Sequence, residues 1–362
     1  MALTLDRLRR FAVHRSLFVA PTLEQAIGRW GFVQADPIRA PARAQDLTLR
    51  HRVDGYRAGD LERRYHELGI EEDFFVNYGF VTNALHSLMH PRPGHAPWSR
   101  SQGKGAALIL KFVRERGSVH PREVNEKFAH GTLTNYWGGS SNATTHLLDL
   151  MHYRGLLRIV RRDAGIRVYG VRDRAALRID KAERARRVDA LIDVAVNIYG
   201  PLPARSFTAL VARIRYGVPQ WKRELKPALA RARKRLAHTH VGHEDWYWPA
   251  AETVGKDAES DSVRLLAPFD PLVWDRRRFE IFWGWPYRFE AYTPAAKRSF
   301  GYYALPLLWR HRVLGWGNVL VKKGKLDVQL GYTAGRPPRE RRFHQAVEEE
   351  LARVHVFLGL GC

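Results

Sequence analysis

The sequence predicts an α+β chain: three tandem winged-helix (helix-turn-helix) units followed by a C-terminal β-rich, barrel-like module. Two observations carry this prediction. A pattern of apolar helix, glycine and second helix recurs around Gly117 and Gly200. After Val263 the composition changes to aromatic and alternating segments that indicate a β-meander. We therefore expect four parts, at residues 1–95, 104–175, 180–250 and 263–362.

The first part opens with amphipathic helices. Apolar spacing predicts helices at residues 4–14, 22–30, 41–51 and 60–68. Thr4 is a suitable N-cap for the first of them. The β-branched and aromatic run at 73–81 predicts a strand, and residues 91–103, with their Pro and Gly, predict a loop.

The two middle parts repeat each other. In each, an apolar helix stops at a glycine, and a second helix begins near Pro121 or Pro203. Third helices are expected over 140–153 and 219–236. A β-hairpin at 156–169 follows the first copy, which completes the order of a winged helix, and a shorter wing is expected in the second copy.

The expected helix at 219–236 has one apolar stripe and is otherwise basic. Lys222, Lys226 and Arg233 lie together beside this stripe, as a helix that packs by one face and binds phosphates by another requires. The alternative is a solvated basic face with no partner. Further candidate DNA-binding residues lie in or before the helix at 41–51: Arg39, Arg43 and Arg50.

The charge of the chain points to a polyanionic partner. Sixty Lys and Arg against 37 Asp and Glu give a net charge of +23. Nucleic acid is the simplest such partner, ahead of a generally basic protein or an anionic membrane. The last C-terminal module, from Val263 on, closes with a helix striped by apolar residues between Phe343 and Leu358.

Cys362 is the only cysteine, which excludes disulfides, thiolate zinc sites and iron–sulfur clusters held by this chain. No apolar run reaches the roughly 20 residues of a membrane helix, and the N-terminus lacks a signal-peptide pattern. We expect a cytoplasmic protein with no cofactor.

The stretch from Phe32 to Ile38 carries two polar side chains, Gln34 and Asp36. In an extended chain both point to one face, and Pro37 ends regular pairing. An amide beside a carboxylate can hold and activate one water molecule. Taken alone, the stretch is better explained as the polar end of a strand before a turn.

Two other groups suggest chemistry less strongly. His238, His240 and His243 resemble a zinc-binding pattern, but they fall where the last wing is expected, which favours a wing rich in histidine. The aromatic run from Phe279 to Phe289 could stack bases, although such density more often forms the core of a β-module.

The block Gln34-Ala35-Asp36-Pro37-Ile38, with Ala42-Arg43-Ala44 and the later Ala267-Pro268-Phe269-Asp270-Pro271-Leu272-Val273-Trp274-Asp275-Arg276, resembles the YcaQ/AlkZ-type bacterial DNA glycosylases. The resemblance runs through nearly the whole chain. It implies excision of N7-alkylguanine and, in some members, unhooking of interstrand crosslinks. It also implies a catalytic Q-x-D motif, here Gln34 and Asp36. Gln45 and Asp46 stand near where many relatives carry histidine, a difference that bears on crosslink preference.

The chemistry agrees with this resemblance. N7-alkylation makes guanine a cationic, good leaving group, so the enzyme must stabilise an oxocarbenium-like sugar and deliver water. Asp36 could do both, with Gln34 orienting the water, and a monofunctional enzyme is expected. We expect a monomer acting on double-stranded DNA that contains alkylated guanine or crosslinks, with Asp270 structural. The alternatives are a non-enzymatic winged-helix regulator and a hydrolase using a metal at His238.

Overall fold

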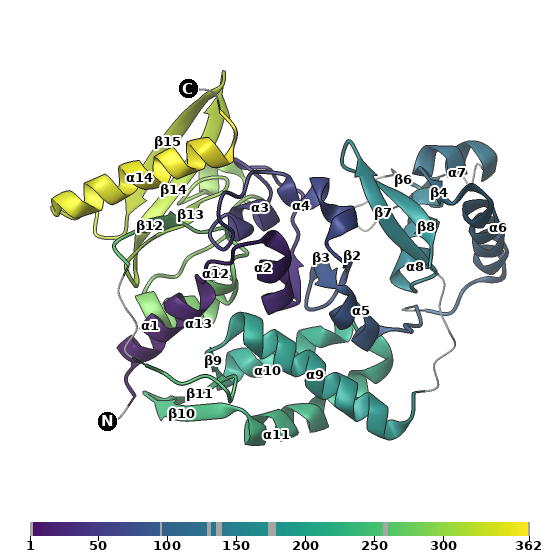
Figure 1. Ribbon diagram of the computed structural model, residues 1–362, viewed down its shortest axis with the longest axis horizontal. Helices are drawn as coiled ribbons and strands as arrows, with labels where there is room; N and C mark the ends of the chain where they lie inside the picture. The colour runs from purple at the N-terminus through teal and green to yellow at the C-terminus, as the bar shows by residue number, and fades with distance from the viewer. Residues whose placement is uncertain are drawn as a thin grey trace. The chain divides into compact units, whose positions relative to one another are not determined.

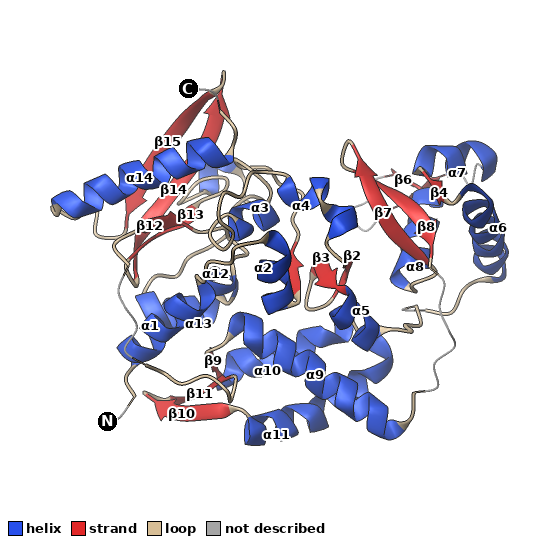
Figure 2. Cartoon of the chain, viewed as in Figure 1, coloured by secondary structure: helices blue, strands red, loops and turns tan. Residues whose placement is uncertain are grey.

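The structure is a computed structural model that describes residues 3–94, 96–128, 132–134, 140–172, 179–255 and 260–360 (Figure 1). It is a mixed α/β chain (Figure 2). The chain divides into two compact units. The first unit comprises Met1–Leu61, Ile192–Ala212 and Leu229–Cys362, and the second comprises Glu62–Leu191 and Arg213–Ala228. The four-part division drawn from the sequence stays a prediction.

The first unit begins with the two helices that apolar spacing predicts. Helix α1 (Leu5–Ser16) starts at Thr4, whose side chain accepts the N–H of Arg7, so the expected N-cap is confirmed. Helix α2 (Leu23–Trp30) ends where Gly31 takes a φ of 76°. Strand β1 (Phe32–Gln34) follows. Helix α3 (Ala44–Leu49) is shorter than the predicted 41–51, because Arg43 is still extended.

A four-stranded antiparallel sheet forms the C-terminal part of the first unit. Its order is β12 (Val263–Leu265), β13 (Leu305–Trp309), β14 (Arg312–Lys322) and β15 (Lys325–Tyr332). Helix α14 (Arg341–Phe357) lies along the sheet (Figure 1), and its Glu350 accepts the backbone N–H of Leu265. The predicted meander and closing helix are confirmed. The expected barrel-like closure is not, because β12 and β15 do not pair and the described sheet stays open.

Two helices that the sequence pattern did not predict lie in the chain between β12 and β13. Helix α12 (Pro271–Trp274) and helix α13 (Arg276–Trp283) contribute to a core shared with α1. Helix α12 provides Leu272 and Val273, and α13 provides aromatic side chains. Phe279 and Phe282 are almost fully buried there. For most of the aromatic run at 279–289, the structure therefore supports the core interpretation.

The chain between residues 181 and 248 follows the predicted order of helices and wing. Its helices are α9 (Lys181–Tyr199), α10 (Ala204–Arg213) and α11 (Leu225–Arg235), with short 3-10 helices η2 (Ile214–Tyr216) and η3 (Pro219–Glu224) between the last two. Strands β10 (Ala237–Val241), β11 (Glu244–Trp248) and β9 (Leu202–Pro203) form one antiparallel sheet. The single helix expected at 219–236 is wrong, because Trp221 leaves helical geometry with a φ of −113°.

The second unit starts with a hairpin where the sequence predicted one strand. The boundary falls within α4 (Asp60–Arg63), after which come η1 (Tyr65–Glu67), β2 (Ile70–Phe74) and β3 (Tyr78–Thr82). The chain turns at 75–77, where Phe75 donates its N–H to the carbonyl of Asn77, so the strand predicted at 73–81 is wrong. Helix α5 (Asn83–Met89) follows.

The rest of the second unit has the predicted order of a helix, a second helix, a third helix and a hairpin (Figure 2). Helix α6 (Arg100–Arg116) begins inside the predicted loop, because Ser99 and Gln102 form a capping box. Then come β4 (Ser118–Val119), α7 (Pro121–Phe128), β5 (Thr132–Thr134), β6 (Ser140–Asn142), α8 (Ala143–Tyr153), β7 (Leu157–Asp163) and β8 (Ile166–Val171). The sheet order is β4-β8-β7. The number of winged-helix units stays a prediction.

None of the helices in the described part of the chain combines the length and the apolar composition that a membrane span needs.

Candidate active site

Gln34 and Asp36 lie at and just beyond the end of a strand. Strand β1 ends at Gln34, so the expectation that both residues share one strand is wrong. Asp36 instead begins a turn, in which its Oδ1 accepts the backbone N–H of Ile38 at 2.9 Å. The backbone N–H of Asp36 donates to Oε1 of Gln45 on α3 at 3.3 Å. The buried Gln45 thereby holds the strand end in place.

The Asp36 carboxylate is half-buried, and few neighbouring groups stabilise its negative charge. Burial raises its pKa, and the N–H of Ile38 opposes that rise only in part. No cation forms an ion pair with Asp36 among the described residues. A partly desolvated carboxylate of this kind is a stronger base than a solvated one, and it attracts a cationic ligand.

Gln34 is buried with one unsatisfied atom. The residue is 7% exposed, and its Oε1 has no hydrogen-bond partner in the described part of the chain. Leaving such an acceptor unpaired costs roughly 1–3 kcal/mol. An acceptor held in this state at a strand end can take a hydrogen bond without giving up an existing one.

Two tyrosines that sequence reasoning missed lie near Asp36. Burial and then the Asp36 charge raise the pKa of Tyr303, and the same two causes raise the pKa of Tyr292. A negative charge opposes ionisation of a phenol only when it lies close by. These tyrosines are more than 250 positions from Asp36 in the sequence, so no spacing pattern could have found them.

Asp270 has the structural role that the sequence suggested. It caps α12 by accepting the N–H of Leu272, and both of its oxygens accept from the Arg52 guanidinium. Neither side chain of this pair is exposed. Arg276 is not the partner, since it donates to the carbonyls of Val273 and Pro268.

The candidate DNA-binding residues differ in exposure. Arg39, Lys222, Lys226 and Arg233 are exposed, and Arg43 is half-buried. Arg233 also donates to the Thr208 hydroxyl at 3.0 Å. Arg50 corrects the expectation: its side chain is 4% exposed and forms an ion pair with the buried Glu350, which leaves no surface for a phosphate.

In the part of the chain that the structure describes, the histidines of the last wing are not in a group that brings three metal-ligand atoms together. His238 and His240 lie on β10, where His240 faces Asp245 of β11 at 2.9 Å. Among the described residues, the group that brings three ligand atoms together is instead Asp73, His86 and His90 in the second unit. Arg92 donates to both oxygens of Asp73, at 2.8 and 3.1 Å, and so takes the place of a metal cation.

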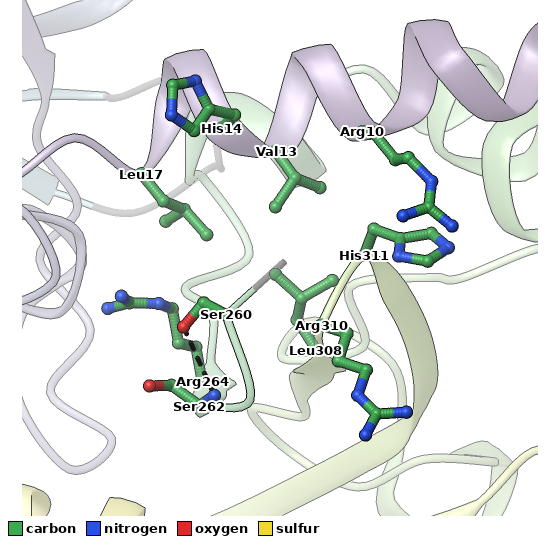
Figure 3. Close-up of a pocket in the computed structure, with 10 residues that line it drawn as sticks. All are labelled: Arg10, Val13, His14, Leu17, Ser260, Ser262, Arg264, Leu308, Arg310 and His311. Atoms are coloured by element: carbon green, nitrogen blue, oxygen red, sulfur yellow. Dashed lines mark hydrogen bonds between the residues drawn. The ribbon is translucent and has the colours of Figure 1, made fainter. Parts of the chain in front are cut away.

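A basic cavity of about 90 Å³ lies elsewhere in the first unit (Figure 3). Figure 3 shows Arg10 and His14 on α1 on one side, with Arg264 on the other. It contains neither Gln34 nor Asp36. Part of its charge is already neutralised, because Arg310 pairs with Asp261 at 2.7 Å.

Comparisons with known proteins identify relatives over nearly the whole chain. The family model "DNA glycosylase AlkZ-like" matches residues 27–357. The structure is similar to that of the Streptomyces sahachiroi DNA glycosylase AlkZ, with a TM-score of 0.62 and 16% sequence identity over 99% of this chain and 98% of that one. This structural likeness supports the fold, and the family match covers most of the chain, including Gln34 and Asp36. The chain therefore belongs to the AlkZ-like DNA glycosylase family and is a DNA glycosylase.

Proposed function

We propose that the protein is a monofunctional glycosylase that hydrolyses the N-glycosidic bond of N7-alkylguanine in double-stranded DNA and leaves an abasic site. The observation that carries this proposal is a half-buried carboxylate at Asp36, with no ion-pair partner among the described residues, two positions after an unsatisfied buried amide oxygen at Gln34. The two groups supply what the reaction needs, a base for water and an acceptor that orients it.

The proposed reaction balances without a cofactor. Water adds to C1′ of the sugar, the C1′–N9 bond breaks, and its electron pair neutralises the positive charge of the leaving guanine. Asp36 takes a proton from the water and, as a carboxylate, stabilises the positive charge that develops on the sugar. Gln34 accepts a hydrogen bond from the same water through Oε1.

A monofunctional outcome fits the sequence around the site. Enzymes that cleave the strand through a Schiff base need an amine nucleophile. The first lysine of the chain is Lys104, so none lies in the segment that carries Gln34 and Asp36. The same hydrolysis would unhook an interstrand crosslink in which N7 of guanine is the attachment point.

DNA binding is proposed to use three winged-helix units and the exposed cations Arg39, Lys222, Lys226 and Arg233, with Arg43 beside the site. A glycosylase acts on one lesion and needs no two-fold operator, so we propose a monomer that acts in the cytoplasm, where the DNA is. A regulator without base release is not favoured, because the family match is to glycosylases.

The decisive experiment measures release of 7-methylguanine from methylated duplex DNA with no metal added. Wild type is compared with Asp36→Asn and with Asp54→Asn, which alters an exposed carboxylate of the same unit. We expect release by wild type and by Asp54→Asn, and a loss of at least about 10²-fold in Asp36→Asn. Equal release by all three proteins would exclude Asp36 as the base. A crosslinked duplex then defines the lesion range.

A further inference from the structure

Four aromatic side chains gather in a group centred on Phe289, and two of them, Tyr292 and Tyr303, feel the charge of Asp36. We call this group the lesion-side cluster; its members are Phe269, Phe289, Tyr292 and Tyr303. The Phe289 ring is its centre, with ring centroids 5.1 Å from Phe269, 5.3 Å from Tyr303 and 6.0 Å from Tyr292. All three contacts are edge-to-face, the arrangement that aromatic rings favour.

The two tyrosines of the cluster differ in exposure. Tyr292 is 79% exposed, although its ring is held against Phe289. Tyr303 is 3% exposed, and its hydroxyl has no hydrogen-bond partner among the described residues. A buried hydroxyl in this state normally finds a partner, because leaving it unpaired is costly. The cluster therefore offers one open aromatic ring and one unsatisfied donor close to the Asp36 carboxylate.

The loop that carries Tyr292 is tied down at its base. The Glu290 carboxylate, which is buried, accepts the backbone N–H groups of Ser299 at 3.1 Å and Phe300 at 2.7 Å. Arg298 donates to the carbonyl of Thr293 at 2.7 Å. A ring on a fixed loop loses little conformational freedom when a ligand stacks on it.

The segment before Tyr303 is fixed as well. Gly301 has a φ of 111°, which a residue with a Cβ rarely adopts, and an added Cβ would lie 2.4 Å from Oδ1 of Asn318. Asn318 itself donates to the carbonyl of Phe300 at 2.7 Å. Both tyrosines are thus presented by backbone that is hydrogen-bonded in place.

We propose that the lesion-side cluster binds the alkylated base itself, with Tyr292 stacking on the cationic purine and the Tyr303 hydroxyl hydrogen-bonding to the bound nucleotide. This inference rests on the proposed function. The face of a tyrosine ring attracts a cation, and N7-alkylguanine is a flat, positively charged ring system. Unmodified guanine has the same flat ring system but lacks the charge, so it stacks on the tyrosine less favourably, and cluster and carboxylate together select the damaged base.

Binding to an uncleaved lesion tests the proposal apart from catalysis. The probes are two duplexes that carry a 2′-fluoro sugar, which slows cleavage of the N-glycosidic bond: one holds a single 7-methylguanine, the other guanine. We expect wild type to prefer the methylated duplex. Tyr292→Ala should lose roughly 5- to 150-fold in affinity for the methylated duplex, the range for one base stacked on an aromatic ring. The preference over guanine should fall with it.

Two variants serve as controls. Tyr292→Phe keeps the ring and should keep most of the preference. Tyr216→Ala removes another exposed tyrosine, which belongs to the second unit, and should leave the ratio of the two affinities unchanged. An unchanged ratio in Tyr292→Ala would overturn the assignment of the cluster. Absence of 7-methylguanine release by wild type would instead overturn the proposed function, so the two failures are distinguishable.

Discussion

Arg52 and Asp270 form a two-fold ion pair in which neither side chain is exposed to solvent. Nη2 of Arg52 donates to Oδ1 of Asp270 at 2.9 Å, and Nη1 donates to Oδ2. The remaining guanidinium hydrogens go to the carbonyls of Ser16 and Thr48 and to the hydroxyl of Ser16. The pair therefore joins α1, α3 and α12 inside the first unit, with both side chains closed to solvent.

Removing one partner of this pair should destabilise the first unit strongly. Asp270→Asn keeps the shape and the helix cap but leaves the Arg52 charge buried and unpaired. Breaking a buried pair in this way costs about 3–5 kcal/mol. Urea unfolding followed by fluorescence measures the loss. The matched control is Glu67→Gln, which breaks the exposed pair with Arg64 and should change stability by less than about 1 kcal/mol. Similar losses in both variants would contradict the structural role.

The partly buried Asp36 carboxylate should lower the stability of the protein while being required for its activity. Because burial raises the pKa of Asp36, the folded protein holds this proton more tightly than the unfolded chain does. The ionised carboxylate therefore costs stability at neutral pH, and that cost disappears as the pH falls below the raised pKa. Asp36→Asn can still accept the N–H of Ile38, so we expect a variant that is inactive and at least as stable as wild type.

The raised pKa of Asp36 should also set the pH at which base excision declines on the acidic side. The carboxylate is the active form, so excision should be full at neutral pH and decline on acidification around a pKa above the ordinary value of about 3.9. Single-turnover release of 7-methylguanine across pH, corrected for spontaneous release, measures this decline. A profile that stays flat down to the ordinary aspartate range would mean that Asp36 is not the titrating base.

The unsatisfied hydroxyl of Tyr303 allows function to be separated from folding. In the free protein the hydroxyl has no partner among the described residues, so Tyr303→Phe should leave stability unchanged or raise it. If the hydroxyl binds the nucleotide, the same variant should lose about 2- to 13-fold in affinity for the uncleaved lesion, the range of one neutral hydrogen bond. Thermal unfolding and lesion binding of one variant decide both points. Unchanged binding would remove Tyr303 from the site.

Local signals in the sequence were enough to predict many element ends. Thr4 starts α1 because its side chain caps a helix whose apolar face is read from neighbouring positions. Gly117 stops α6 with a φ of 74°, a conformation that glycine adopts readily. Such signals depend on a few adjacent residues, so they can be recognised in the sequence without knowledge of the fold.

The features that the sequence predicted wrongly or did not predict share a physical cause: they depend on tertiary packing. Two of the three residues in the turn at 75–77, Phe75 and Val76, are apolar and fully buried, so they resemble residues of a buried strand. Periodicity cannot show a turn that is packed in the core. Gln34 and Asp36 could be proposed from sequence, but Tyr292 and Tyr303 reach Asp36 only through the fold. Arg50 resembled a DNA contact until the structure showed Glu350 beside it.

Arg92 should stabilise the second unit through Asp73. Burial alone would raise the pKa of Asp73, but Arg92 and then His90 hold it well below its usual range. Asp73 therefore contributes stability that is present above its unfolded pKa and is lost only as the pH falls through the lowered one. Arg92→Met removes the guanidinium, which also donates to the carbonyls of Gly217 and Tyr153, and should cost about 3–5 kcal/mol at neutral pH.

The pH dependence of that loss identifies its cause. Without Arg92 the buried Asp73 carboxylate becomes protonated at a higher pH than in wild type. The difference in unfolding free energy between wild type and Arg92→Met should therefore shrink as the pH is lowered from 7 towards 5. A difference that stays constant over this range would show that lost packing, and not the unpaired charge of Asp73, accounts for the effect.

Exposed cations of η3 and α11 should control the salt dependence of DNA binding. Lys222 and Lys226 are exposed and form no ion pair among the described residues, so each can release a counterion when it meets a phosphate. The double variant Lys222→Ala, Lys226→Ala should lower the slope of log affinity against log salt by about 1.8, since each phosphate contact contributes about 0.9. The effect should be the same for damaged and undamaged duplexes, because phosphates carry no information about the base.

The control for this prediction is Lys322→Ala. Lys322 is already paired with Asp327 at 2.5 Å, so this variant should leave the slope unchanged. Equal slopes for the double variant and wild type would show that η3 and α11 do not contact the DNA phosphates. That result would not bear on the proposed role of Asp36.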